Sequence, residues 1–311
     1  MIKAQHLSKK YRKKVAVDDL SFSVETGKVT GFLGPNGAGK STTMRLMLGL
    51  DNGNGQTTFD GKKLHDYDQP AKVVGILLEA KAYHPTRTAQ NHLKILATAG
   101  NIPVKRVDEV LDIVGLKDVA KKKPGKFSLG MSQRLGIAAA ILGQPKYLLL
   151  DEPANGLDPE GIAWLRQFLK DYADQGNAVF VSSHLLSEMS QMADNIVVIG
   201  KGQLIADTSM KKLVAGSGHA SVFARANNLL SLEKLLKAKK IDYKPADDGL
   251  EIFGITTDAV GKLAFSNKLT ILELANRQAS LEEAFLELTA GAEEYKGGGG
   301  KKWLLPLKPN F

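Results

Sequence analysis

The sequence predicts an α/β fold built around a largely parallel sheet, and three observations lead to that prediction. One run matches the phosphate-binding pattern G-x-x-x-x-G-K-[ST] at every fixed position: Gly34-Pro35-Asn36-Gly37-Ala38-Gly39-Lys40-Ser41-Thr42. An apolar run precedes this loop and a helix with an apolar face follows it, which is the context that such a loop requires. A second apolar run, residues 147–150, ends in two carboxylates and suits a central strand buried on both faces.

The first 30 residues predict an antiparallel flank to this sheet. Apolar and polar residues alternate around Leu20, Phe22 and Val24, as in a half-buried strand. The pairs Asp18-Asp19 and Thr26-Gly27 are typical of turns, so we expect the chain to turn at both places.

The phosphate loop lies between a predicted strand at 29–33 and a predicted helix at 41–50. Glycines let consecutive backbone N–H groups converge on a phosphate chain, and the helix N-terminus adds a partial positive charge. Lys40 is expected to reach the β- and γ-phosphates, and the Ser41 hydroxyl is expected to ligate Mg²⁺. The predicted nucleotide-binding residues of this loop are Asn36, Gly37, Ala38, Gly39, Lys40, Ser41 and Thr42.

Residues 80–145 predict a helical subdomain inserted into the sheet-based core. Helices are expected at 89–99, 104–114 and 133–142, where the alternation typical of a sheet is missing. The stretch 81–88 contains Pro85 and no clear period, so it is expected to be a loop.

The two carboxylates after residues 147–150 suit nucleotide hydrolysis. Ligand sites in open parallel sheets lie at the carboxyl ends of strands, so Asp151 and Glu152 should emerge beside the phosphate loop. Asp151 is expected to hold Mg²⁺ through water, and Glu152 is expected to act as general base on the attacking water. The alternative is an acidic pair that only caps the next turn.

A third motif narrows the family. Residues 127–134, with the sequence FSLGMSQR, precede an apolar helix and lie shortly before the second apolar run. Here the chain resembles the ATP-binding-cassette (ABC) ATPases, whose signature reads roughly L-S-G-G-Q at this place. The resemblance covers about residues 1–215 and implies a P-loop NTPase domain of that type.

The resemblance also implies roles for residues outside the phosphate loop. Tyr11 matches the aromatic residue that stacks on adenine, and Ser128 and Gly130 match the signature that meets a γ-phosphate. Residues 155–158, Asn-Gly-Leu-Asp, match the D-loop. His184, after a strand expected at 178–182, matches the switch histidine, whose ring N–H can bond a γ-phosphate oxygen.

Two positions depart from the usual family pattern. Glu79 stands where the family usually has the glutamine of the Q-loop, and Leu129 replaces the first glycine of the signature. Both variants resemble the bacitracin-export and lantibiotic-immunity branch. Glu79 can still coordinate Mg²⁺ or position water, so it is a candidate for both metal binding and catalysis. Ser128 and the Gly130 backbone can still meet a γ-phosphate.

The chain after the ATPase core predicts a second, smaller α+β domain. A hairpin at 195–206 is expected to close the core. From about residue 216 the sequence predicts a different pattern of strands and helices. The predicted order β-α-β-β-α-β, followed by a last helix, suggests a ferredoxin-like unit. Its elements are expected at 219–226, 229–239, 241–244, 250–255, 257–266, 269–276 and 281–290.

These patterns predict three parts of the chain. They are an ATPase domain at 1–215, an accessory domain at 216–292, and a Gly-rich linker with a basic, apolar tail at 293–311. The accessory domain is either a packing element or a regulatory or dimer-contact element. The tail is either an appendage or a segment that docks on a membrane or a partner.

Composition narrows the class of protein. The chain has 311 residues and no cysteine, with 43% hydrophobic and 24% charged residues, which is ordinary for a soluble protein. It contains no stretch of about 18 apolar residues that could span a bilayer. Met1-Ile2-Lys3-Ala4 lacks the apolar core of a secretory signal, and we expect a cytoplasmic protein.

The net charge of +9 leaves three interpretations open. Residues 1–14 hold six Lys or Arg and no acid, and a second cluster combines 121–123 with Lys126. A solvated face, an anionic membrane surface and a nucleic acid would each suit such clusters. Aromatic residues do not interleave with these charges, so no nucleic-acid partner is expected.

The motifs and the resemblance together imply ATP as ligand, Mg²⁺ as cofactor and ATP hydrolysis that drives an exporter of a drug, peptide or lipid-like compound. The implied assembly is a nucleotide-sandwich dimer of two copies with a separate membrane permease, on the inner face of the cell membrane. The implied permease contact is the Q-loop and the adjoining helical subdomain, with Tyr83, His84 and Arg87 as candidates.

Two alternatives remain open at this point. One is a soluble cassette ATPase that acts as a mechanical switch on ribosomes or nucleic acid. The other is a nucleotide-dependent binding module with little turnover.

Overall fold

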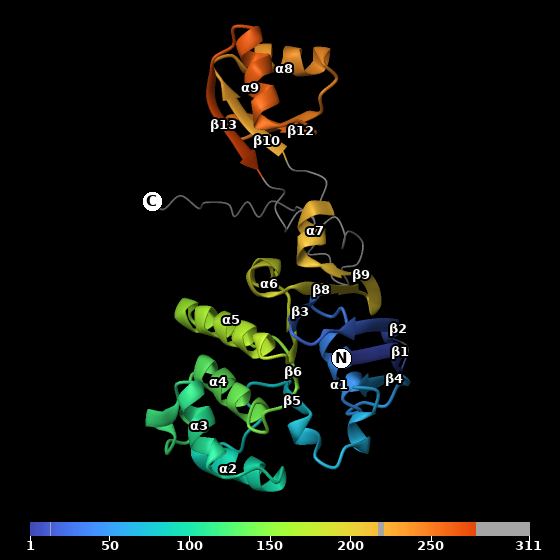
Figure 1. The fold of residues 1–311 in the computed structure, drawn as a ribbon, viewed down its shortest axis with the longest axis vertical. Coiled ribbons are helices and arrows are strands. Elements are labelled where there is room, and N and C mark those ends of the chain that lie inside the picture. The colour runs from blue at the N-terminus through green and yellow to red at the C-terminus, as the bar shows by residue number, and fades with distance from the viewer. Residues whose placement is uncertain (13, 217–220, 278–311) are drawn as a thin grey trace, which may run out of the picture. The chain divides into compact units, whose positions relative to one another are not determined.

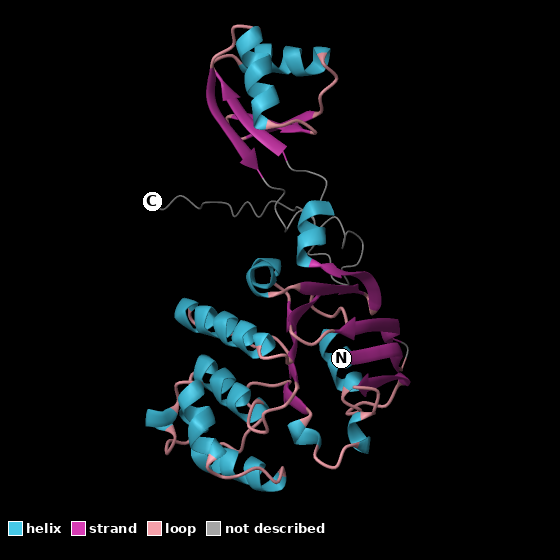
Figure 2. Cartoon of the chain, viewed as in Figure 1, coloured by secondary structure: helices cyan, strands magenta, loops and turns pink. Residues whose placement is uncertain are grey.

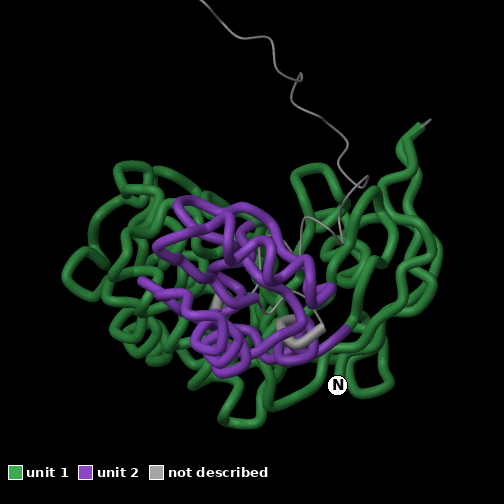
Figure 3. Tube along the Cα trace, turned by 90° about the horizontal axis from the view of Figure 1, so that it is seen from above, with its two compact units in different colours: residues 1–184, 196–207, 289–311 green, residues 185–195, 208–288 purple. Residues whose placement is uncertain are grey.

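The computed structural model describes residues 1–12, 14–216 and 221–277, which form two compact units (Figure 3). The first unit comprises residues 1–184 and 196–207, and the second comprises the described residues of 185–195 and 208–288. The helix predicted at 281–290 and the tail predicted at 293–311 lie outside the described residues. The predicted domain boundaries at 215 and 292 stay predictions.

A six-stranded sheet forms the centre of the first unit, with the strand order β5-β6-β7-β3-β8-β9 (Figure 1). The pairs β5–β6, β6–β7 and β3–β7 are parallel, as the buried apolar runs predict. The strands span β3 Lys28–Leu33, β5 Val74–Leu77, β6 Tyr147–Leu150, β7 Ala178–Ser183, β8 Asn195–Gly200 and β9 Gln203–Ser209.

The predicted antiparallel flank is a separate three-stranded sheet in the order β2-β1-β4. It consists of β1 Ile2–Tyr11, β2 Lys14–Val24 and β4 Asn54–Phe59. The turn predicted at Asp18-Asp19 is wrong, because β2 continues through both residues. Asp19 takes a left-handed φ of 51° at a place where the register between β1 and β2 shifts. Two turn-forming residues therefore produce a β-bulge within β2. The reversal between β1 and β2 lies earlier in the chain, directly after Tyr11.

Helices in the segment 80–145 confirm that this part of the first unit is helical (Figure 2). Thr88 caps α2, and Ser128 caps α4, by accepting backbone N–H groups of the first turn. The α-helices of the first unit are α1 Lys40–Met47, α2 Ala89–Ala99, α3 Arg106–Ile113, α4 Leu129–Ala140 and α5 Pro159–Asp174. Short 3₁₀ turns span Leu64–Asp66, Pro70–Lys72, Lys117–Val119 and Pro124–Lys126.

The core of the first unit joins the two sheets and fixes the position of the phosphate loop. Phe22 of the antiparallel sheet contacts Phe32 and Phe180 of the parallel sheet, with ring centroids 5.7 and 5.4 Å away. Helix α4 packs closely on β5, since a Cβ on Gly136 would lie 2.4 Å from the Leu77 side chain. The strand ends that flank the loop therefore rest on a rigid, buried layer.

The second unit contains the predicted β-α-β-β-α-β order in its described residues. Its sheet has the order β11-β12-β10-β13, and the pairs β11–β12, β10–β12 and β10–β13 are antiparallel. Strands β10 and β11 are therefore parallel with β12 between them, which is the split βαβ arrangement. The elements span α6 Leu186–Met192, α7 Met210–Gly216, β10 Ser221–Ala226, α8 Leu229–Ala238, β11 Tyr243–Ala246, β12 Gly249–Phe253, α9 Thr257–Ser266 and β13 Ile271–Arg277.

Candidate active site

The predicted catalytic motifs meet at the carboxyl edge of the parallel sheet. In the register, Leu33 pairs with Ser183 and Leu150 pairs with Val181, so β3, β7 and β6 end side by side. The phosphate loop follows β3, the two carboxylates follow β6, and His184 follows β7. Three segments that are far apart in sequence therefore meet in one place, as the rule for open parallel sheets predicts.

The phosphate loop is packed closely against the neighbouring backbone and leads into an uncapped helix. Gly39 has a φ of 105°, and a Cβ there would lie 2.4 Å from the Ala16 carbonyl oxygen. A Cβ on Gly34 would lie 2.6 Å from the Ile199 carbonyl oxygen. Helix α1 begins at Lys40 without a capping side chain. The N–H groups of its first turn therefore suit the oxygens of a bound phosphate chain.

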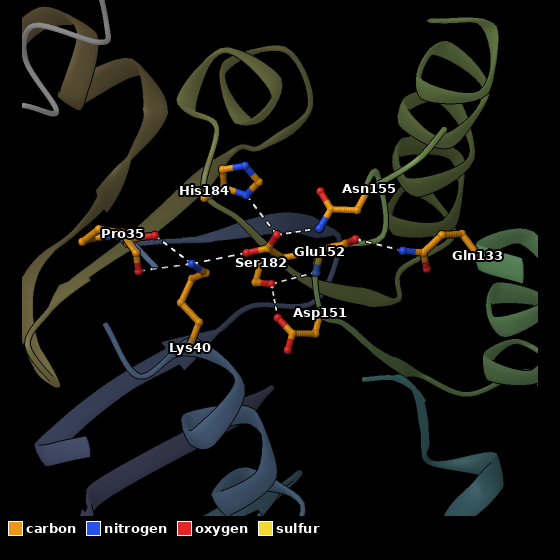
Figure 4. Close-up of polar contacts among 9 residues, drawn as sticks. Pro35, Lys40, Gln133, Asp151, Glu152, Asn155, Ser182 and His184 are labelled. Atoms are coloured by element: carbon orange, nitrogen blue, oxygen red, sulfur yellow. Dashed lines mark hydrogen bonds and ion pairs between the residues drawn. The ribbon is translucent and has the colours of Figure 1, made fainter. Parts of the chain in front are cut away.

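Lys40 bridges the loop and the catalytic carboxylate (Figure 4). Its side chain is only 6% exposed, and Nζ donates a hydrogen bond of 2.8 Å to the Gly34 carbonyl oxygen. The same Nζ lies 3.4 Å from Oε1 of Glu152. A buried cation between the loop and the carboxylate gives the site one fixed positive charge where phosphate oxygens would bind.

Glu152 is held through its backbone N–H and through both oxygens of its carboxylate. Its own backbone has a left-handed φ of 46°, and its N–H donates to Ser182 Oγ at 2.9 Å. Its Oε2 accepts from Asn155 Nδ2 at 2.7 Å and lies 2.9 Å from His184 Nδ1 (Figure 4). A left-handed φ in a non-glycine residue is strained, and strain of this kind gathers at functional sites.

Electrostatics keep the Glu152 carboxylate ionised. Burial raises the pKa of Glu152, but the Asn155 amide, the Lys40 cation and His184 outweigh burial and hold the pKa below its ordinary value. An ionised carboxylate only accepts hydrogen bonds, so the shared proton at His184 is on Nδ1.

Asp151 and Ser41 offer the oxygen ligands that Mg²⁺ prefers. Asp151 Oδ1 accepts a hydrogen bond of 2.5 Å from Ser182 Oγ, and the Asp151 N–H donates to the Leu77 carbonyl oxygen at 2.7 Å. Ser41 is exposed in the first turn of α1. These oxygen ligands, beside the uncapped N-terminus of α1 and the buried Lys40, fit a magnesium triphosphate. In the described residues, three or more His, Asp or Glu side chains do not gather into a cluster that could bind a metal by itself.

Glu79 lies near this edge but outside the contacts described above. It follows β5, which pairs with β6, and its side chain is exposed. Asp51 and, more weakly, Glu79 raise the pKa of Arg45. Glu79 therefore faces a cation of helix α1.

Tyr11 ends β1 and is linked to the end of helix α1. Its ring is 46% exposed, and its hydroxyl donates a hydrogen bond of 2.7 Å to Asp51 Oδ2. Arg45 Nη2 lies 3.2 Å from the other oxygen of Asp51. Lys9 Nζ lies 4.8 Å from the centre of the Tyr11 ring. The ring is thus positioned by its hydroxyl, and stacking on adenine stays a prediction.

Ser128 and Gly130 occupy a different place, the first turn of α4. Ser128 Oγ accepts the Met131 N–H at 3.1 Å. A Cβ on Gly130 would lie 2.9 Å from the Gly156 carbonyl oxygen, and a Cβ on Gly156 would lie 2.3 Å from Leu129 Cδ2. The signature and the D-loop of one chain therefore pack against each other.

Two residues contact Asp151 or Glu152 although the sequence did not predict a site role for them. Ser182 bridges Asp151 and Glu152, and Gln133 Nε2 donates to the Glu152 carbonyl oxygen at 3.2 Å (Figure 4). Ser182 is the last but one residue of β7, the strand that precedes His184. A polar residue in an apolar run next to a predicted site was the available signal. For Gln133 the signal was a polar residue on the buried face of α4.

Family models match both units of the chain. A model described as ABC transporter matches residues 17–155, and a model of a domain of unknown function matches residues 220–282. A third model, described as an AAA domain of a putative AbiEii toxin, matches residues 123–190. None of the helices in the described part of the chain combines the length and the apolar character needed to cross a membrane.

Curated relatives match over most of their length. The bacitracin transport ATP-binding protein BcrA of Bacillus licheniformis is 36% identical over 304 residues, which cover 94% of this chain and 98% of BcrA. The lantibiotic transport ATP-binding protein SrtF of Streptococcus pyogenes is 36% identical over 208 residues, which cover 67% of this chain and 90% of SrtF. A solved ATP-binding subunit of an ABC transporter is similar with a TM-score of 0.64 and 26% identity, over 70% of this chain and 93% of that chain.

Proposed function

The chain belongs to the family of ABC transporter ATP-binding proteins, and from this premise we propose that it uses ATP hydrolysis to drive a separate permease that exports a drug, peptide or lipid-like compound. The observation that carries the proposal is the cluster of Lys40, Glu152 and His184 at the ends of three neighbouring strands. A phosphate binder without hydrolysis would need Lys40 and the loop, but it would not need the ionised Glu152.

Glu152 is the proposed general base. It is ionised at neutral pH, and its two oxygens have different partners, Lys40 on Oε1 and Asn155 with His184 on Oε2. With phosphate oxygens bound at Lys40, Oε1 becomes available to take a proton from the attacking water. General-base help of this kind is worth roughly 10²- to 10⁴-fold in rate.

His184 is proposed to contact the γ-phosphate. In a ring with a single proton, that proton is on Nδ1 and is donated to Glu152. An N–H for a γ-phosphate oxygen therefore requires either protonation of the second ring nitrogen or release of Nδ1 from Glu152. Glu152 and the γ-phosphate thus compete for the same donor.

The magnesium ligands are proposed to be the Ser41 hydroxyl and Asp151, with Glu79 as a further candidate. Bound Mg²⁺ would neutralise charge on the β- and γ-phosphates. The Ser182 hydroxyl fixes one oxygen of Asp151, so the other oxygen keeps a defined direction for a water ligand of the metal.

The assembly is proposed to be a dimer in which the signature of one copy meets the ATP held by the other. Because Ser128 Oγ accepts the Met131 N–H, its own proton can be donated to a phosphate oxygen. The exposed first turn of α4 adds N–H groups and a partial positive charge. On this proposal Tyr11 stacks on the adenine of its own chain.

The names of two relatives support the proposed transport role, and a place on the inner face of the membrane is proposed with it. BcrA and SrtF are named for transport of bacitracin and of a lantibiotic. The soluble-switch alternative suits proteins with two cassettes or a long helical insert, whereas this chain has one phosphate loop and short helices in 80–145.

The first test is copurification of the full chain with its membrane partner. The chain is captured in mild detergent from membranes of the organism that makes it, and its partners are identified by mass spectrometry. A polytopic permease at near-equal yield, with ATPase activity that rises when the permease is present, supports the proposal. Ribosomal proteins or nucleic acid without a permease would overturn it in favour of the soluble switch.

A further inference from the structure

Tyr83 links the loop after Glu79 to the signature helix. It lies in the segment 81–88, between β5 and α2, and its side chain is half-buried. Its hydroxyl lies 2.8 Å from Ser132 Oγ of α4. The ring meets the His92 ring of α2 edge-on, with centroids 6.3 Å apart. Tyr83 is thus placed by contacts with both α2 and α4.

The protons in this contact have a defined direction. Ser132 is fully buried, and its hydroxyl donates to the Ser128 carbonyl oxygen at 2.9 Å. A serine hydroxyl has a single proton, so Tyr83 must be the donor at Ser132 Oγ. The result is a chain of two hydrogen bonds from Tyr83 through Ser132 to the backbone of Ser128, and such chains strengthen each bond.

The end of this chain is the residue predicted to meet the γ-phosphate. The Ser128 carbonyl oxygen accepts both the N–H and the hydroxyl of Ser132, at 3.0 and 2.9 Å. A serine hydroxyl that bonds the carbonyl four residues earlier bends a helix locally. Ser132 thus contacts the backbone at the start of α4, and Tyr83 contacts Ser132.

A cavity lies beside Tyr83. Tyr83, His92 and Glu79 line a cavity of about 300 Å³. Burial, with Arg87 nearby, lowers the pKa of His92, so the ring beside Tyr83 is uncharged at neutral pH. Exposed neighbours in the loop, such as His84 and Pro85, leave its outer side open to contact.

We propose that Tyr83 is a positioning residue that sets the direction of the first turn of α4, and thereby the reach of Ser128 toward an ATP held by the opposite copy. This inference rests on the proposed nucleotide-sandwich dimer. A displacement of the loop breaks the Tyr83 bond to Ser132 and loosens Ser128. Whatever contacts the segment 81–88 therefore acts on the nucleotide of the other copy through two hydroxyl groups.

The test measures ATP-dependent dimerisation of the full chain by analytical ultracentrifugation in a Glu152→Gln background, which removes the predicted base. Tyr83→Phe keeps the ring and removes only the hydroxyl. We expect the dissociation constant of the ATP-bound dimer to rise about 3- to 10-fold, the size expected for one hydrogen bond. The affinity of the single chain for ATP should not change, because Tyr83 does not contact the phosphate loop.

Two further variants separate positioning from a general structural effect. Tyr172→Phe removes a tyrosine hydrogen bond to the Pro145 carbonyl oxygen, away from α4, and should leave the dimer constant unchanged. Ser132→Ala should weaken the dimer, and adding Tyr83→Phe to it should have no further effect, because Tyr83 acts through Ser132.

The outcomes are distinct. An unchanged dimer constant in Tyr83→Phe, an effect equal to that of Tyr172→Phe, or additive effects of Tyr83→Phe and Ser132→Ala would each overturn the inference. Failure of the Glu152→Gln chain itself to dimerise with ATP would overturn the proposed sandwich dimer and this inference with it.

Discussion

The carboxyl edge of the parallel sheet and the first turn of α4 both belong to the predicted ATP site, but they differ in burial and in the partners of their side chains. At the sheet edge, Lys40 is 6% exposed and Glu152 is 22% exposed, and both contact groups of the same chain. In α4, Ser128 is exposed and Leu129 is 45% exposed. Side chains at the sheet edge thus have partners within the same chain. Side chains at the start of α4 are exposed, as expected for a surface that contacts a second copy.

The two regions should therefore respond differently to substitution. Where a chain positions a catalytic group by its own contacts, a change of that group affects every step that needs it. Where a group points outward, a change should leave the affinity of the single chain for ATP intact and lower the rate of the step that needs a partner. Five substitutions test whether the two regions differ in this way.

The largest expected effect is that of Glu152→Gln at the sheet edge. The amide has the same shape but cannot take a proton, so we expect ATP hydrolysis to fall roughly 10²- to 10⁴-fold while ATP still binds. Steady-state ATPase and binding of a fluorescent nucleotide measure the two quantities. An unchanged hydrolysis rate would remove Glu152 from the role of base.

Lys40→Ala should weaken ATP binding itself, by about 100-fold, because a charge-assisted contact to phosphate is lost. Isothermal titration calorimetry gives the affinity. Lys105→Ala, which removes an exposed lysine of the helical subdomain, serves as the control and should bind ATP normally. Retained affinity in Lys40→Ala would count against the phosphate-loop role.

Gly156→Ala tests the contact between the signature and the D-loop. Gly156 has a φ of 78°, and a Cβ there would lie 2.8 Å from the Cβ of Leu129, so the free energy of unfolding should fall by about 2 kcal/mol. The control is Gly176→Ala, with a similar φ of 86° but nothing within 4 Å, which should cost about 1 kcal/mol. Urea denaturation measures both. Equal losses would show that the Leu129 contact has no energetic role.

Ser128→Ala should lower ATPase activity about 10-fold and leave the affinity of the single chain for ATP unchanged, because its proton is predicted to serve the opposite copy. The variant also removes the N-cap of α4, so stability should fall by about 1 kcal/mol. Thr88→Ala removes the N-cap of α2 and provides the matched control for that loss. A comparable drop in activity in Thr88→Ala would assign the effect to helix stability.

The smallest expected effect belongs to Asp51→Asn, beside Tyr11. The Tyr11 hydroxyl and Arg45 lower the pKa of Asp51 below its unfolded value of 3.8. A carboxylate with a depressed pKa adds stability above its unfolded pKa and loses it as the pH falls through the folded pKa. We expect Asp51→Asn to be about 1 kcal/mol less stable than the wild type at pH 7, with the difference shrinking below pH 4. A difference independent of pH would show that the charge of Asp51 does not contribute.

The sequence was sufficient for the parts of the molecule whose chemistry leaves few alternatives. The phosphate loop and the carboxylates after β6 follow from residue type and strand position. Strand β4 was not predicted, since Asn54 and Gly55 are poor strand formers and pairing with β1 decides their conformation. The bulge at Asp19 was predicted as a turn, because the same residues suit both and only the register with β1 selects between them.

Contacts across long sequence separations account for what the sequence left open in the site. Gln133 and Ser182 contact the backbone of Glu152 only because α4 and β7 lie beside the end of β6. The hydroxyl of Tyr83 finds Ser132 across 49 residues. No local pattern encodes such pairs, since each residue taken alone is an ordinary polar side chain.

The close approach of Leu129 to Gly156 limits which residues can occupy these two positions in related proteins. A leucine at the third position of the signature leaves no room for a side chain at the second position of the D-loop. During divergence of relatives, the two positions should change together or not at all. A glycine at 129 would remove this clash, but the left-handed φ of 78° at Gly156 would still disfavour a side chain there. Leu129 of the signature and Gly156 of the D-loop are thus coupled by their close contact, so selection acts on the pair.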